Sequence, residues 1–218
     1  MAAVVAYLIV LLIFLDACAP IPPAAGRAAP RPHDALGRPG LHVLDPYLEA
    51  RLSALASLSP RFAAALARLR AGDVPVYVGT PARLAALPLD PGIVGGRLPP
   101  ERVAELRIVL EPGTDRPAVL VVRVDLDRLA RLVRRPLLDG PLPGGAARFR
   151  KRLARVTEAT LLHEVWGHLV PVADAGSAAA SCADPAPGEP ELDSCVMRRE
   201  NELRGELGWG RRKAYRLM

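Results

Sequence analysis

Aromatic side chains are scarce in this chain of 218 residues, because Phe, Trp and Tyr together make up only 4% of it. The core must therefore be mainly aliphatic. Lysine is nearly absent as well, since 27 of the 29 basic residues are arginine. No stretch interleaves aromatic with basic residues as nucleic-acid-binding motifs do. The formal net charge of +6 thus favours contact with anionic surfaces, and nucleic acid is not an expected partner.

Long apolar runs are also lacking, except at the N-terminus. Residues 2–15 form an uncharged apolar run that is short of the roughly 20 residues a membrane-spanning helix needs, and it suits the central part of a signal peptide. The following Leu15, Ala17 and Cys18 resemble a bacterial lipobox, which implies cleavage after residues 1–17 and lipidation of Cys18. The expected location is the bacterial cell envelope, as a membrane-anchored lipoprotein, or outside the cell. The alternatives are an uncleaved N-terminal anchor and a signal peptide that is cut nearby at a small residue.

Cysteine occurs only three times, at Cys18, Cys182 and Cys195. If Cys18 carries lipid, an even pair remains, and the residues between its members are rich in Pro and acids. In an oxidising compartment we expect a Cys182–Cys195 disulfide, which would stabilise the fold by about 3 kcal/mol. Neither cysteine has a C-x-x-C partner, so a cysteine-based zinc site is not expected.

The rest of the sequence predicts one α+β domain, mostly helical, with a small β-hairpin sheet packed on the helices. Residues 18–40 are rich in Pro, Ala and Gly and should form a tether, which leaves 41–218 as the domain. Helical spacing predicts two helices broken near Pro60. The other predicted elements are a short strand at 74–79, a helical turn in "PARLAALP", a hairpin of 106–112 with 118–126, and helices at 125–135, 146–170 and 194–208.

The most informative stretch is "HEVWGH", which spans His163 to His168. Zinc peptidases commonly carry HExxH, in which two histidines four residues apart share one face of an α-helix. Here the second histidine comes one residue later, about 140° around a regular helix. A π-bulge would restore a shared face, and Gly167 eases such a distortion. We therefore expect His163 and His168 to bind Zn²⁺ and Glu164 to act as the general base.

HExxxH resembles the zinc motif of the dipeptidyl peptidase III family, where it commonly reads HELLGH. That family has a second motif, EECRAE, whose second Glu is the third zinc ligand, and "NELRGE" aligns with it. The resemblance implies that Glu202 is the third ligand and that Glu206 supports a ligand histidine. "NELRGE" is also similar to the NExxxD motif of thermolysin-like peptidases. The resemblance covers only the two motif helices, and it implies a gluzincin-type zinc site without the exopeptidase specificity.

Two alternatives for the third ligand stay open. Val196, Glu200, Leu203 and Leu207 share one helical stripe, so Glu200 is expected on the buried side of its helix, about 200° from Glu202. A looser similarity, to small peptidase domains of secreted bacterial effectors and toxins, allows Glu200 or Asp193.

The sequence as a whole predicts an exported zinc metallopeptidase that hydrolyses a peptide or protein substrate in the cell envelope or outside the cell. Tyr215, with Arg211 or Arg212, is a candidate to stabilise the oxyanion. Two other readings remain, namely a non-catalytic envelope lipoprotein that binds a partner and a secreted toxin or effector protease.

Overall fold

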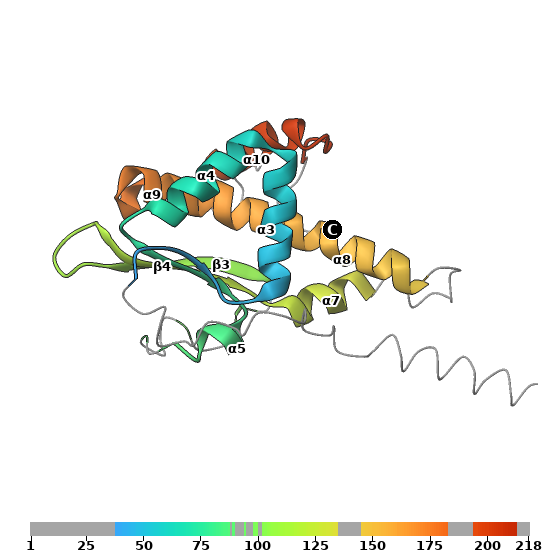
Figure 1. Cartoon of the computed structure of the whole chain (residues 1–218), viewed down its shortest axis with the longest axis horizontal. Coiled ribbons are helices and arrows are strands. Elements are labelled where there is room, and N and C mark those ends of the chain that lie inside the picture. The colour runs from blue at the N-terminus through green and yellow to red at the C-terminus, as the bar shows by residue number, and fades with distance from the viewer. Residues whose placement is uncertain are drawn as a thin grey trace, which may run out of the picture.

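The computed structural model describes residues 38–87, 89, 94, 98–99, 102–134, 145–182 and 194–212. Its elements, in order, are β1 (Gly40–Val43), α3 (Pro46–Leu58), α4 (Pro60–Ala71), β2 (Pro75–Gly79), α5 (Pro81–Leu84), β3 (Ala104–Leu110), β4 (Pro117–Val124), α7 (Leu126–Arg134), α8 (Gly145–Leu161), η2 (Leu162–Leu169), α9 (Val170–Ala175), η3 (Ala178–Ala180) and α10 (Cys195–Glu206). The α+β class is as predicted (Figure 1). No helix within these ranges is both long and apolar enough to cross a membrane. The signal peptide, Cys18 and most of the tether lie outside the described residues.

The sheet has four strands in the order β1-β2-β4-β3. The predicted hairpin is confirmed as the antiparallel pair β3 and β4. The sheet is larger than predicted, because β1 and β2 add to β4 as parallel strands. Strand β1 was not predicted, since a four-residue strand is too short to show a repeating pattern.

The main core lies between the sheet and the helices. Side chains alternate along β2, so Val76 and Val78 join the core cluster that includes the buried residues of α3, α4 and η2. Tyr77 points to the opposite face, where it packs with Leu84 of α5. Figure 1 shows the corresponding layers, with α3, α4, α8 and α9 on one side of the sheet and α5 on the other.

The break between α3 and α4 is as predicted and has a local cause. Ser59 ends α3 and caps α4, because its hydroxyl accepts a hydrogen bond from the backbone N–H of Phe62. Pro60 occupies the first turn of α4, where a missing N–H costs nothing. Gly208, with φ of 64°, follows the end of α10 as expected for a glycine after a helix.

The predicted helix at 146–170 is part of a longer helical run formed by α8, η2 and α9. The prediction that it ends at Pro171 was wrong, since α9 continues to Ala175 and ends before Gly176, whose φ is 61°. Pro171 lies in the first turn of α9, directly after the π-helical segment, and proline is tolerated in a first turn. The HEVWGH segment therefore lies in the middle of one uninterrupted helical run from Gly145 to Ala175.

Candidate metal centre

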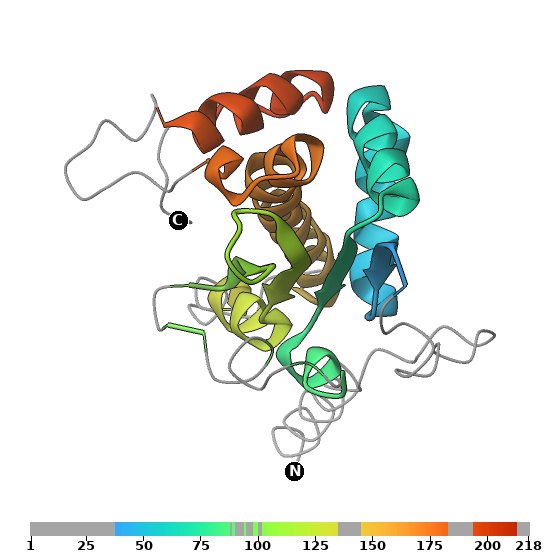
Figure 2. The same ribbon diagram turned by 90° about the vertical axis from the view of Figure 1, so that its left-hand side faces the viewer.

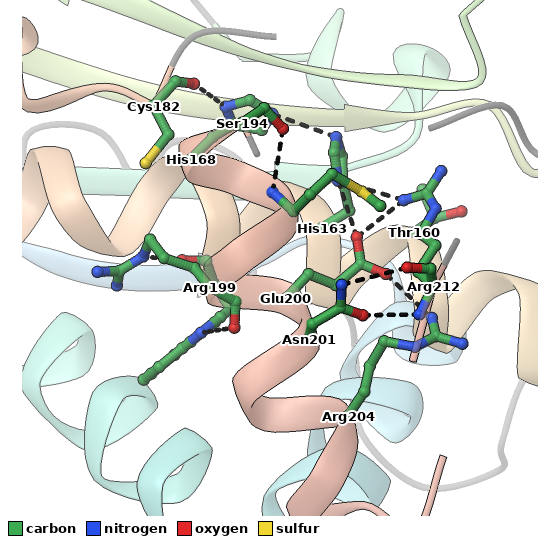
Figure 3. Close-up of polar contacts among 12 residues, drawn as sticks. Thr160, His163, His168, Cys182, Ser194, Arg199, Glu200, Asn201, Arg204 and Arg212 are labelled. Atoms are coloured by element: carbon green, nitrogen blue, oxygen red, sulfur yellow. Dashed lines mark hydrogen bonds and ion pairs between the residues drawn. The ribbon is translucent and has the colours of Figure 1, made fainter. Parts of the chain in front are cut away.

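The HEVWGH segment lies in a π-helix, as the sequence predicted. The π-helix η2 spans Leu162–Leu169, and all eight of its residues are buried. A π-helix bonds residue i to residue i+5, so side chains five positions apart lie on one side of it. His163 and His168 consequently meet edge to face, with ring centroids 4.8 Å apart. Their Nε2 atoms are 3.2 Å apart (Figure 3).

Gly167 allows α10 to pack closely against η2, and Figure 2 shows the two elements side by side. A Cβ at this position would lie 2.4 Å from Cγ2 of Val196, well inside van der Waals contact. Val196 is fully buried in the first turn of α10. The glycine is therefore required for the close approach of the two helices that build the site, in addition to any role in forming the π-helix.

Replacing Gly167 with alanine is expected to destabilise the fold by about 1–3 kcal/mol, because the new methyl group overpacks the contact with Val196. Gly205 is the matched control, since it lies in α10 and a Cβ there meets nothing within 4 Å. Alanine at Gly205 should stabilise the protein by up to about 1 kcal/mol. Denaturant unfolding of both variants measures the difference. Equal effects would show that the η2–α10 contact is not tight.

Each histidine ring is held through its Nδ1 atom. Nδ1 of His168 donates to the backbone carbonyl oxygen of Cys182 at 2.6 Å. Nδ1 of His163 lies 3.2 Å from a carboxylate oxygen of Glu200. Arg212 Nη1 is also 3.5 Å from this nitrogen, but it donates to the same Glu200 oxygen at the shorter distance of 2.8 Å. Carbonyl and ionised carboxylate oxygens only accept hydrogen bonds, so both Nδ1 atoms carry the proton.

In the neutral form of both rings, this tautomer leaves an unprotonated lone pair on each Nε2. The two Nε2 atoms then face one another across 3.2 Å, which is unfavourable unless a metal ion or an additional proton lies between them. Two nitrogen ligands of a tetrahedral zinc ion, each about 2.0–2.1 Å from the metal, lie about 3.3 Å apart. Histidine ligands of metals usually donate their other N–H to a carboxylate or a carbonyl, as both rings do here. The residues present therefore fit two ligands of a zinc ion.

Glu200 is the centre of a buried charge cluster. Its side chain is fully buried and accepts hydrogen bonds from Arg204 at 3.0 Å and from Arg212 at 2.8 Å (Figure 3). Burial raises the pKa of Glu200, but the hydrogen bond to His163 and the charge of Arg212 outweigh it and lower the pKa to about 2. The carboxylate is thus ionised at neutral pH and available to orient the ring of His163.

The depressed pKa of Glu200 predicts a loss of stability in acid. The carboxylate contributes fully above its unfolded pKa of 4.5, and this contribution is lost as the pH falls toward the folded value of about 2. The shift corresponds to about 3 kcal/mol. Because other carboxylates also titrate, the measurement is the difference in unfolding free energy between wild type and Glu200→Gln at pH 5, 4, 3 and 2. The difference should shrink by that amount, and a constant difference would contradict the assignment.

The structure does not bring Glu202 to the histidines. Its side chain is 57% exposed and pairs with Arg61 at 3.4 Å. Glu206 lies on the same side of α10, where it accepts hydrogen bonds from Ser59 at 2.6 Å and from Arg61 at 3.2 Å. Both carboxylates bond to groups at the start of α4, and neither hydrogen-bonds to His163 or His168. The position of Glu200 follows the helical stripe in the sequence, whereas Glu202 and Glu206 were chosen from the motif resemblance.

The C-terminal tail reaches the site through Asn201. The side-chain amide of Asn201 bonds the backbone of Arg212 twice, accepting from its N–H at 2.6 Å and donating to its carbonyl at 3.2 Å. This pair of bonds places the guanidinium of Arg212 against Glu200. Arg211, the other candidate for oxyanion stabilisation, is exposed. Sequence reasoning missed three groups at the site, namely Arg204, Asn201 and the carbonyl of Cys182.

No family model, curated protein or solved structure matches this chain.

The other candidate residues are only partly placed. Glu164 is buried in η2, with 7% of its surface exposed. Asp193 and Tyr215 lie outside the described residues. Among the residues that are described, no third His, Cys, Asp or Glu completes a metal-holding group. The disulfide between Cys182 and Cys195 is present as predicted, and it joins the carbonyl anchor of His168 to the first residue of α10.

Proposed function

We propose that this chain is an exported zinc-dependent peptidase with His163 and His168 as two of its zinc ligands. The observation that carries the proposal is the pair of Nε2 atoms held 3.2 Å apart, with a hydrogen-bond acceptor beside each Nδ1 atom. Without a metal, one ring of this pair would have to carry a second proton and donate it to the other ring.

The roles of the acids change from those expected from the motif resemblance. Glu200 serves as the carboxylate that orients His163 and raises its basicity toward a metal, in place of Glu202 or Glu206. Arg204 and Arg212 keep Glu200 ionised and occupy its remaining lone pairs. Because the carboxylate of Glu200 already bonds the ring of His163 and two guanidinium groups, we assign it to orienting a ligand and not to binding the metal itself.

Glu164 gives the site a catalytic character. A bound zinc ion supplies Lewis-acid activation of a water molecule. Glu164 follows directly after a ligand and is buried, which suits a general base that takes the proton of the water and returns it to the leaving amine. A purely structural metal site has no use for such an acid. The proposed reaction is therefore hydrolysis of a peptide bond in a peptide or protein of the cell envelope or outside the cell.

Replacing Glu164 with glutamine is expected to lower peptide hydrolysis by about a hundredfold or more, because the amide cannot accept the proton. The full-length protein, loaded with zinc, is incubated with a mixture of unstructured peptides, and new termini are counted by mass spectrometry. Zinc content must be equal in wild type and variant, so that loss of turnover is separated from loss of metal. Undiminished turnover in the zinc-loaded variant would contradict the proposed mechanism.

A further inference from the structure

The positive charge of the protein is concentrated on two neighbouring helices. Helices α7 and α8 together carry eight basic and two acidic side chains, a net charge of +6, which equals the formal net charge of the whole chain. The two helices pack against one another, as Figure 1 shows. Arg134 of α7 also lies over the ring of Phe149 of α8, 5.1 Å from its centroid.

Four of the five basic residues of α8 form one outward face. Arg148, Lys151, Arg152 and Arg155 follow the spacing i, i+3, i+4, i+7, which places them on one side of a helix. All four are exposed. The opposite side of α8 is buried, with Leu153 and Thr157 facing the protein. We call these four residues the basic face of α8.

This face differs from the other arginine-rich surfaces, because three of its four cations have no acid partner among the described residues. Arg51, Arg61, Arg68 and Arg70 of the neighbouring helices all pair with acids. The one acid of α8, Glu158, is taken by Arg51 at 3.2 Å. In the described part of the chain, the side chains of Arg148, Lys151 and Arg152 have no ion-pair or hydrogen-bond partner, while Arg155 stacks on Trp209.

Helix α7 adds exposed apolar surface next to positive charge. Leu132 is 39% exposed and is one of three large hydrophobic side chains exposed on the described residues. Arg131 precedes it and is also exposed. An exposed leucine next to an exposed arginine is typical of protein surfaces that lie in the headgroup region of a membrane.

We propose that the basic face of α8, together with Arg131 and Leu132 of α7, docks on an anionic phospholipid membrane. The guanidinium and ammonium groups would pair with lipid phosphates, and each such residue near an anionic surface is worth about fivefold in affinity. A bilayer suits this face better than a nucleic acid, because the face itself presents no aromatic side chain on which bases could stack.

The N-terminal sequence provides a reason for such contact. If residues 2–15 hold the chain at a membrane, the tether of residues 18–40 spans at most about 80 Å, so the domain never leaves the vicinity of the bilayer. Even a weak docking face then acts at high effective concentration. His163 lies 11 residues beyond Arg152 along the helical run, or about 16 Å at 1.5 Å per residue, so docking would hold the candidate metal centre at a fixed distance along the helix from the bound face. This proposal does not depend on the proposed peptidase activity.

Energy transfer from tryptophan to a dansyl-labelled lipid tests the docking. The chain has only two tryptophans, and Trp209 lies under Arg155 at the end of the basic face, with the guanidinium carbon 3.4 Å from the ring centroid. Full-length protein is bound to vesicles of neutral phosphatidylcholine or of phosphatidylcholine with phosphatidylglycerol. Residues 2–15 would contribute equally to binding on both kinds of vesicle. The ratio of energy transfer on anionic vesicles to that on neutral vesicles therefore reports docking alone.

The wild type should give at least about twofold more energy transfer on anionic than on neutral vesicles at low salt, and high salt should abolish the difference. The triple variant Arg148→Gln, Lys151→Gln, Arg152→Gln should bring the ratio to one. The matched control is Arg38→Gln, Arg83→Gln, Arg116→Gln, which removes the same charge from exposed positions elsewhere and should keep the wild-type ratio. A wild-type ratio of one would overturn the proposal, as would equal losses in the two triple variants. A face that binds a labelled oligonucleotide but not anionic vesicles would overturn it too.

Discussion

Replacing Glu200 with alanine is expected to weaken zinc binding about ten- to hundredfold and to destabilise the fold by about 3–5 kcal/mol. The affinity falls because Nδ1 of His163 loses the carboxylate that fixes its ring and its tautomer. The stability falls because Arg204 and Arg212 would be left with two positive charges beside a buried site. Competition with a chromogenic zinc chelator gives the affinity, and denaturant unfolding gives the stability.

The same substitution at Glu202 separates this account from the motif resemblance. Glu202 forms only an exposed ion pair with Arg61, so alanine there should change stability by less than about 1 kcal/mol and leave zinc affinity unchanged. Loss of zinc from Glu202→Ala, with zinc retained by Glu200→Ala, would contradict this account. It would mean that Glu202 binds the metal in a geometry different from the one described. Asp193→Ala, measured in the same series, tests the candidate that lies outside the described residues.

Removing the disulfide is expected to have the second large effect. The bond closes a loop with a sequence separation of 13, so its loss should destabilise the fold by about 3 kcal/mol. The carbonyl of Cys182 also holds His168, and Cys195 begins the helix that carries Glu200. Without the disulfide, the hydrogen bonds that hold the rings of His168 and His163 should both weaken. Zinc affinity should therefore fall by about tenfold or more.

The measurement compares the Cys182→Ser, Cys195→Ser double variant with oxidised and reduced wild type. Reduced wild type should match the double variant in both stability and zinc affinity. Reductant added to the double variant should have no further effect, which controls for action on Cys18 or on the metal itself. A double variant with wild-type zinc affinity would show that the carbonyl of Cys182 is held in place by other contacts.

Local features of the sequence were sufficient to predict much of the fold. Pro60 marked the break between two helices, the turn between 112 and 118 marked the hairpin, and the five-residue spacing of His163 and His168 with Gly167 indicated a π-helical segment. Each of these signals comes from residues that are close in sequence. The parallel pairing of β1 with β2 was missed, because it depends on the packing of two helices between the strands.

In the candidate site too, local sequence patterns predicted some residues correctly, whereas contacts between distant segments were missed. The apolar stripe through Val196 and Leu203 correctly put Glu200 on the buried side of α10, whereas alignment with a second motif pointed to Glu202, which is exposed. The anchor of His168 is a backbone carbonyl, and no side-chain pattern in a sequence can reveal one. The clamp of Asn201 on Arg212 joins a helix to an irregular tail, so it too follows only from the three-dimensional arrangement.

The zinc content of the purified full-length protein tests the central claim most directly. After incubation with zinc and removal of free metal, elemental analysis should find about one zinc ion per chain in the wild type. His42→Ala should retain it, because His42 lies away from the pair and bonds the carbonyl of Arg38. His163→Ala and His168→Ala should each retain none. A wild type that holds no zinc, or either of these two variants holding as much as wild type, would contradict a metal centre built on the facing imidazoles.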